Sequence, residues 1–81
     1  MITIKELFNK IRWDPYEIPT DYNFVFHYYD RVKDRLIELP YLNILRLEGT
    51  FFILNDVDET MIPSHRVKKV TKMGEIIWER N

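Results

Sequence analysis

The chain has 81 residues, of which 46% are hydrophobic and 15% aromatic, and its formal net charge at pH 7 is -1. We expect a single domain, residues 1–81, with a dense core, because so short a chain buries only about 60–65% of its extended surface. The near-zero net charge excludes a general polyanion-binding protein. No segment approaches the roughly 18 apolar residues of a membrane helix, and the chain has no cysteine for a disulfide or a thiolate metal site. These features predict a cytoplasmic protein that does not enter a membrane.

The first predicted element is an amphipathic helix near the N-terminus. Thr3 and Glu6 have the spacing of a capping box, in which the threonine side chain accepts a hydrogen bond from the main chain at the start of the helix. Apolar residues then recur on one face, at Ile4, Leu7, Phe8 and Ile11. The helix should end at Asp14, because the residue before Pro15 is disfavoured in helical conformation. Its apolar stripe should pack on a sheet, since an isolated helix of this length is marginally stable.

The rest of the chain predicts a series of short strands. Segment 22–30 carries apolar groups on both faces, which is typical of a central strand. Further strands are expected at 36–39, 44–48, 51–55, 61–63, 67–73 and 76–80, with Gly49-Thr50 as a hairpin turn, 56–59 as a solvated acidic turn, and Ile76 and Trp78 in the core. Pro63 favours an edge or bulge position, and the alternation in 67–73 is too imperfect to define a register. We therefore predict an α+β fold, in which the helix packs on a strongly curved antiparallel sheet or a partly open small β-barrel of about 5–6 strands.

One stretch of the near-neutral chain is locally basic. Between Met61 and Gly74 there is no acidic residue, whereas four cations occur, at Arg66, Lys68, Lys69 and Lys72. Such cations can contact phosphate, and aromatic side chains can stack on bases; the candidates for stacking are Trp13, Tyr16, Tyr28 and Tyr29. The pattern alone favours a plainer interpretation, in which the lysines protect a strand edge and the aromatic residues fill the core.

The pattern gives little support to a metal site or to catalysis. His27 and His65 are the only histidines, and without cysteine or a His-x-x-x-His spacing we expect no metal and no cofactor. Ser64 and His65 are adjacent, so in extended backbone their side chains point to opposite faces and do not form a nucleophile–base pair. A non-catalytic protein is favoured, and an enzyme in which His65 acts as general acid or base beside a carboxylate is the alternative.

Four motifs, spread over nearly the whole chain, carry a resemblance to a known family. They are Ile11-Arg12-Trp13-Asp14-Pro15, Tyr29-Asp30-Arg31, Ile62-Pro63-Ser64-His65-Arg66-Val67 and Gly74-x-x-x-Trp78-x-Arg80. Together they resemble a small archaeal family of uncharacterised proteins, and related domains occur at the ends of some eukaryotic proteins. That family has been proposed to recognise RNA ends that carry a 2′,3′-cyclic phosphate.

The resemblance implies a set of ligand-facing residues and a partner. The set is Arg12, Trp13, Asp14, Tyr29, Asp30, Arg31, His65 and Arg66. In this interpretation arginine and histidine hold the terminal phosphate, an aromatic ring stacks on the terminal base, and the two aspartates orient the arginines. The implied partners are RNA 3′ ends and RNA-processing or repair proteins, bound by a non-catalytic module. A protein–protein interaction domain and a small phosphate-ester enzyme using His65 are the alternatives, and the oligomeric state stays open.

Overall fold

The structure of the protein, a computed structural model, describes residues 2–13 and 23–80, although the side chain of residue 13 lies outside the described part. The described elements are one helix, α1 (Ile4–Trp13), the strands β1 (Phe24–Asp30), β2 (Arg35–Pro40), β3 (Ile44–Glu48), β4 (Phe51–Leu54), β5 (Met61–Pro63), β6 (Val67–Lys72) and β7 (Glu75–Glu79), and the short 3-10 helices η1 (Tyr41–Asn43) and η2 (Ser64–Arg66). No helix in residues 2–13 and 23–80 is long and apolar enough to cross a membrane. The predicted start of the first strand at Tyr22 lies outside the described residues.

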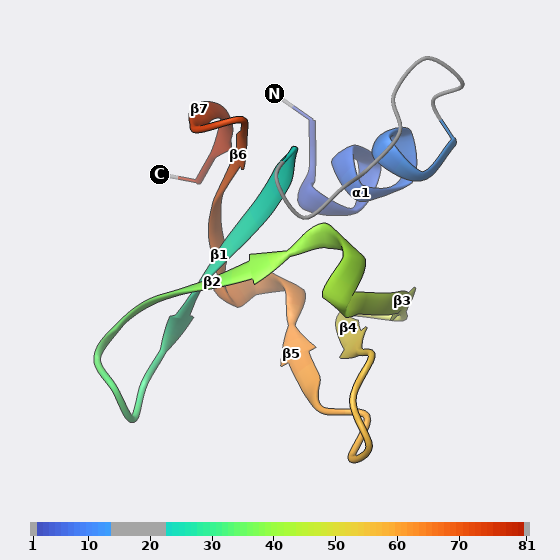
Figure 1. Ribbon diagram of the computed structural model, residues 1–81, viewed down its shortest axis with the longest axis vertical. Helices are drawn as coiled ribbons and strands as arrows, with labels where there is room; N and C mark the ends of the chain where they lie inside the picture. The colour runs from blue at the N-terminus through green and yellow to red at the C-terminus, as the bar shows by residue number, and fades with distance from the viewer. Residues whose placement is uncertain (1, 14–22, 81) are drawn as a thin grey trace.

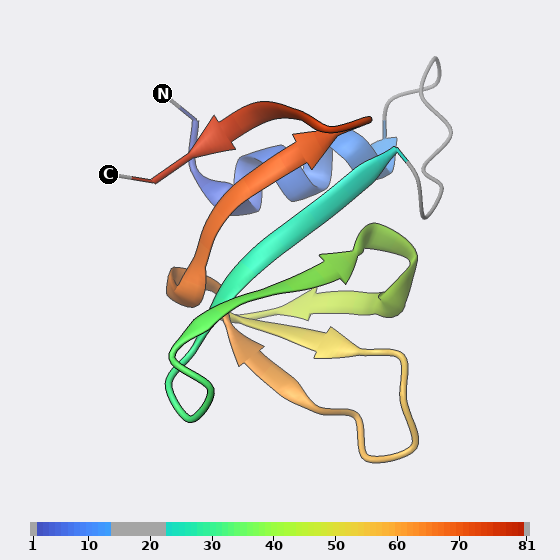
Figure 2. The same ribbon diagram turned by 60° about the vertical axis from the view of Figure 1, so that its left-hand side comes forward.

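The strands form two antiparallel sheets, so the predicted α+β class is confirmed. One sheet has the order β2-β1-β6-β7 and the other the order β3-β4-β5, and β1 is internal as predicted (Figure 1). The expected barrel or strongly curved single sheet is wrong, because neither sheet of the described chain closes or curls strongly. After β2 the chain turns through Pro40 and η1 and begins a second sheet instead of extending the first. Figure 2 shows β3, β4 and β5 fanning away from β1 and β6.

The core lies where α1 meets both sheets. The ring centroid of Phe8 on α1 lies 6.2 Å from that of Phe26 on β1 and 5.2 Å from that of Phe52 on β4. The last two rings, one from each sheet, are themselves 5.7 Å apart. The predicted apolar stripe of the helix is confirmed, since Ile4, Leu7, Phe8 and Ile11 are all buried. One aromatic side chain on the helix therefore joins the two sheets.

Two hydrogen bonds fix the start of the helical segment. The amide of Glu6 donates to Oγ1 of Thr3 over 3.1 Å, which confirms the threonine half of the predicted capping box. The indole Nε1 of Trp78 donates to the carbonyl of Ile2 over 2.8 Å, so the last strand is tied to the residues that precede α1. The start of α1 and the end of β7 consequently lie on the same side of the molecule (Figure 2).

The prediction that Trp78 and Ile76 share the core is half wrong. Trp78 is buried, whereas Ile76 is 53% exposed. The register of β6 with β7 shifts between Val70, which pairs with Trp78, and Thr71, which pairs with Ile76. Ile77 is left as an extra residue in this bulge, and the bulge breaks the alternation that would otherwise place Ile76 and Trp78 on one face.

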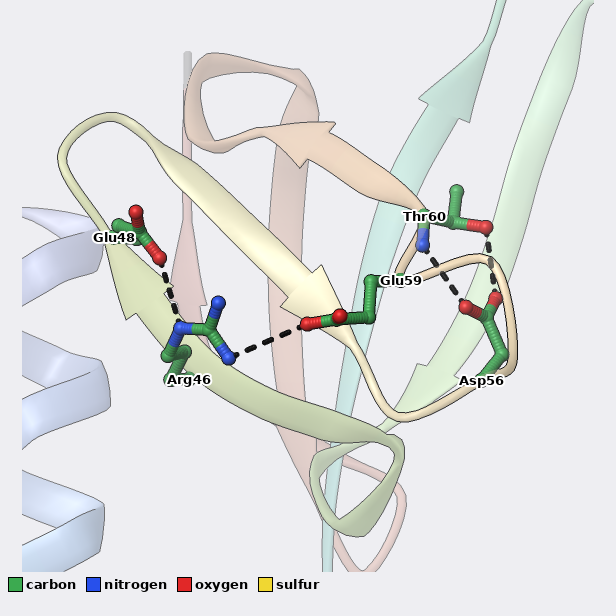
Figure 3. A network of polar contacts seen from close by, with 5 residues as sticks. All are labelled: Arg46, Glu48, Asp56, Glu59 and Thr60. Atoms are coloured by element: carbon green, nitrogen blue, oxygen red, sulfur yellow. Dashed lines mark hydrogen bonds and ion pairs between the residues drawn. The ribbon is translucent and has the colours of Figure 1, made fainter.

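A polar network shapes the exposed loop between β4 and β5 (Figure 3). The carboxylate of Asp56 accepts hydrogen bonds from the amide of Thr60 over 2.9 Å and from its hydroxyl over 2.8 Å. The hydrogen bond from the Thr60 amide holds the pKa of Asp56 below its ordinary value, because this bond stabilises the carboxylate. Arg46 bridges Glu48 and Glu59 on the same side. This loop leads directly into β5 and then into η2.

Candidate functional site: a basic cavity

The pairing of β1 with β6 brings two of the four sequence motifs together. In this antiparallel register Tyr28 pairs with Val67. The residues that follow Tyr28 in the chain therefore lie beside the residues that precede Val67. As a result the segment Tyr29-Asp30-Arg31 lies next to η2, which contains His65 and Arg66.

A cavity of about 260 Å³ lies at this junction, and we call it the basic cavity. It is lined by Tyr29, Arg31, His65, Arg66 and Lys68. Three of these five side chains are cations and none is acidic. Tyr29 and Arg66 are half-buried, and the other three are exposed, so the cavity is open to a ligand from solution.

Lys68 reaches the basic cavity because of a β-bulge. On β6, Lys69 pairs with His27 and Val67 pairs with Tyr28, so Lys68 has no counterpart on β1. The extra residue allows Val67 and Val70 to be fully buried although they are three positions apart. Nζ of Lys68 lies 3.5 Å from the carbonyl oxygen of His65, to which it donates. The bulge thus explains why apolar and polar residues alternate imperfectly in the sequence of this strand.

The main chain of η2 is held from two directions. The amide of Ser64 donates to the carbonyl of Thr50 in the β3–β4 turn over 2.8 Å. Arg80, after the last strand, donates through Nη2 to the carbonyl of Ser64 and through Nε to the carbonyl of Val67, over 3.4 and 3.1 Å. The Arg80 guanidinium also lies over the ring of Trp78, 5.2 Å from its centroid. These contacts fix the main chain that carries the two central residues of the basic cavity.

A hydrogen bond fixes the aromatic side of the cavity. The hydroxyl of Tyr29 donates to Oδ1 of Asp34, which lies in the turn between β1 and β2. This bond raises the pKa of Tyr29, because ionisation would place two negative charges side by side. Asp34 adopts a left-handed backbone conformation with φ of 51°, which Asp tolerates better than most residues. The ring of Tyr29 is therefore held in place at the edge of the cavity.

The cations of the basic cavity have no acidic partners among the residues that the structure describes. Among residues 2–13 and 23–80, the two ion pairs both involve Arg46, on the second sheet. Arg31, Arg66 and Lys68 form no ion pair with any carboxylate in that part of the chain. Unneutralised like charges around one concave site create a local positive potential, which favours the binding of an anion.

Asp30 shapes the turn that carries Arg31. Its Oδ1 accepts hydrogen bonds from the amides of Val32 and Lys33, over 2.9 and 3.1 Å. Such a side-chain contact to the following main chain is the usual action of aspartate in a turn. The sequence interpretation has Asp30 orient an arginine side chain. Within the described residues Asp30 accepts these two main-chain hydrogen bonds, and its orienting role toward an arginine stays a prediction.

The helix-end motif does not join this cavity through Arg12. Arg12 is exposed in the last turn of α1. Burial raises the pKa of Tyr41, and the positive charge of Arg12 opposes this rise in part. A helix rises about 1.5 Å per residue, so Arg12 is roughly 12 Å along the axis from Ile4 at the helix start. Asp14, Tyr16 and the side chain of Trp13 lie outside the described residues.

The two histidines occupy different environments. His27 lies on β1, with its Nε2 3.3 Å from Oγ1 of Thr71, and it does not line the basic cavity. Burial lowers its pKa, as does the neighbouring charge of Lys69. Within the described part of the chain, no three histidine or carboxylate side chains gather where they could hold a metal ion.

Sequence reasoning omitted Lys68 from the candidate site, although the basic run already marked it as a cation. The missing information was the bulge on β6. Strict alternation along a strand does not predict that Lys68 lies beside η2. Tyr28 was a candidate for base stacking, but it packs against the hydrophobic core. Of the candidate set, the structure brings Tyr29, Arg31, His65 and Arg66 together around one cavity.

Comparison with known proteins gives one family. The family model described as the MJ1316 RNA cyclic group end recognition domain matches residues 1–80. The chain is 35% identical over 79 residues to a UPF0248 protein of Metallosphaera sedula, with 98% of this chain and 94% of the relative covered. It is 38% identical over 81 residues to a UPF0248 protein of Pyrococcus horikoshii, covering 95% of this chain and 88% of the relative. No solved structure matches.

Proposed function

The chain belongs to the MJ1316 RNA cyclic group end recognition family, and we propose that its basic cavity binds RNA ends carrying a 2′,3′-cyclic phosphate without cleaving them. The observation that carries this proposal is the gathering of three cations and His65 around one open cavity, where the described part of the chain provides neither an ion-pair partner nor an acidic lining residue. A cyclic phosphate is a compact anion with two free oxygens. Guanidinium groups hold such oxygens by charge-assisted hydrogen bonds, two of which can come from one arginine.

The side chains of the basic cavity have separate roles in this proposal. Arg66 is half-buried, and it lies on η2, whose main chain is fixed by a hydrogen bond from Arg80. It therefore supplies the principal contact to the phosphate. Arg31 and Lys68 are exposed and add attraction at the rim, where solvent and salt screen it more strongly. A ring N–H of His65 donates to a phosphate oxygen, and the ring of Tyr29 offers a surface on which the terminal base stacks.

The direct test is a fluorescence-anisotropy titration with short RNAs of one sequence and three different ends. The ends are a 2′,3′-cyclic phosphate, a linear 3′-phosphate and a 3′-hydroxyl. We expect the cyclic end to bind most tightly and its affinity to fall steeply with salt, as phosphate contacts require. Equal affinity for all three ends would rule out end recognition. The cyclic end should also be recovered intact after incubation, and ring opening would instead identify an enzyme that uses His65.

A matched pair of arginine variants separates the cavity from the general charge of the molecule. Arg66→Ala should weaken binding of the cyclic end by about tenfold or more, the size expected for a lost charge-assisted contact. Its melting temperature should not change, since the Arg66 side chain forms no hydrogen bond within the described part of the chain. Arg46→Ala removes the same charge from the second sheet and should leave binding unchanged. A parallel loss of stability and binding in Arg66→Ala would make Arg66 structural.

One observation favours a second candidate function, a protein-interaction domain. Strand β7 is at the edge of its sheet and exposes Ile76 and Ile77 by 53% and 43%. An edge strand with exposed apolar side chains can pair with an extended segment of a partner. Such binding would respond little to salt, in contrast to phosphate contacts. Ile76→Lys should abolish it and leave the binding of RNA unaffected.

A further inference from the structure

A second cavity, of about 370 Å³, adjoins the basic cavity and shares His65 with it. Its lining includes Thr3 and Lys5 from the start of α1, Ser64 and His65 from η2, and Trp78 and Arg80 from the end of the chain. We call it the helix-start cavity. We propose that it binds the phosphodiester that precedes the terminal nucleotide of the RNA end. This inference rests on the function proposed for the basic cavity and extends it from an end group to a dinucleotide.

The start of α1 provides main-chain donors for an anion. The first amides of a helix have no acceptor within the helix. The hydroxyl of Thr3 accepts from the amide of Glu6, which leaves the amides of Ile4 and Lys5 for another acceptor. Both residues line the helix-start cavity. Because the helix dipole is positive at this end, a phosphate oxygen is a favourable acceptor there.

Ser64, a largely buried residue, offers a further hydrogen-bond donor to a ligand. Ser64 is only 8% exposed, and it lines the helix-start cavity. Its amide and carbonyl are hydrogen-bonded, but its hydroxyl has no partner in the part of the chain that the structure describes. No fully enclosed polar side-chain atom among the described residues lacks a partner, so the Ser64 hydroxyl is not fully enclosed, and Ser64 is one of the residues that line the helix-start cavity. A hydroxyl in this position is satisfied when it donates to a ligand oxygen.

Two cations, Lys5 and Arg80, also favour an anion in the helix-start cavity. A lysine in the first turn of a helix is electrostatically unfavourable, yet Lys5 occupies that position in α1. Arg80 also lines the cavity, where it donates to two carbonyl groups of the chain, and it forms no ion pair with a described carboxylate. Glu6, the acidic residue of the first turn, does not line the cavity. A bound anion would offset the repulsion between Lys5, Arg80 and the positive helix end.

The shared His65 identifies which anion fits. Two anion sites separated by one side chain suit two phosphates of a single strand better than two unrelated ions. The terminal nucleotide of such an RNA carries its cyclic phosphate on one side of the ribose and its 5′-phosphodiester on the other. Because the two cavities share His65, we expect a strand with its cyclic phosphate in the basic cavity to place its next phosphate in the helix-start cavity.

The test compares three small ligands by calorimetric titration of the whole chain. They are uridine 2′,3′-cyclic phosphate, the dinucleotide UpU ending in a 2′,3′-cyclic phosphate, and the same dinucleotide with an uncharged methylphosphonate linkage. We expect the natural dinucleotide to bind at least about ten times more tightly than the mononucleotide. A gain of this size corresponds to one additional charge-assisted contact to a phosphate. The uncharged dinucleotide should bind like the mononucleotide.

Variants locate the gain within the protein. Lys5→Gln and Ser64→Ala should each reduce the advantage of the natural dinucleotide and leave mononucleotide affinity unchanged. Lys10→Gln removes a lysine from the last turn of the same helix and should affect neither ligand. Equal affinity of wild-type protein for mononucleotide and dinucleotide would overturn the second site alone, as would tight binding of the uncharged dinucleotide. Failure of both cyclic-phosphate ligands to bind would overturn the proposed function, and this inference with it.

Discussion

The guanidinium of Arg80 donates a hydrogen bond to the main-chain carbonyl of Ser64, 3.4 Å away and 16 positions earlier in the chain. Its Nε donates to the carbonyl of Val67 over 3.1 Å, so one side chain spans both ends of η2. The ring of Trp78 supports the guanidinium from one face. The last of the four sequence motifs therefore acts on the main chain that presents His65 and Arg66.

Replacing Arg80 should loosen η2. Arg80→Ala removes two hydrogen bonds from a charged group, so we expect the free energy of unfolding to fall by about 2 kcal/mol. Hydrogen exchange should speed up at the amide of Val67, which closes η2 by donating to the carbonyl of Ser64. Arg35→Ala, which removes an exposed guanidinium from β2, is the matched control. Unchanged exchange at Val67 in the Arg80 variant would show that η2 holds its shape without this contact.

Variants of Asp34 separate the backbone of the turn from its hydrogen bond to Tyr29. Asp34→Ala loses the bond and also the short polar side chain that makes the left-handed conformation tolerable, a conformation that costs an ordinary residue about 1–2 kcal/mol, so its melting temperature should fall. Asp34→Gly loses the bond but suits the backbone, and it should weaken RNA binding without lowering the melting temperature. Asp34→Asn keeps an acceptor and should change little. Wild-type RNA affinity in Asp34→Gly would show that the bond to Tyr29 is dispensable.

The contact between helix and sheets at Phe8 should dominate the stability of the fold. Phe8→Ala leaves a cavity between Phe26 and Phe52, and we expect it to lower the free energy of unfolding by about 3–5 kcal/mol in urea titrations. Val57→Ala, at a position that is fully exposed, should change it by less than about 0.5 kcal/mol. Similar effects of the two substitutions would mean that α1 does not join the two sheets in solution.

His27 should make stability depend on pH. Burial lowers the pKa of His27 in the folded protein below its ordinary value of 6.5, so the unfolded chain binds a proton more readily than the folded one. Stability should therefore be highest above about pH 6.5 and decline as the pH falls from there toward the lowered folded pKa. Urea unfolding between about pH 7.5 and pH 5 measures the decline, above the range in which carboxylates titrate. His27→Gln should flatten the profile, and an unchanged slope would assign the effect to other groups.

The sequence by itself determined the features whose causes lie within a few residues. The capping contact of Thr3, the apolar stripe of α1 and the internal strand β1 were all predicted and are present. The hairpin turn at Gly49 was also predicted, and its left-handed φ of 62° is a conformation that glycine adopts without strain. Periodicity and turn chemistry are local, so they can be read without knowing which strands pair.

Only the tertiary structure decided how these elements combine into a site. The division into two sheets and the bulges on β6 and β7 depend on the pairing of segments that are far apart in the chain. The pairing of Tyr28 with Val67 brings the two central motifs together, and the bulge at Lys68 adds a cation to them. Arg12, in the last turn of α1, does not line this cavity. Register is set by the sum of many cross-strand and core contacts, and no single stretch of sequence contains that sum.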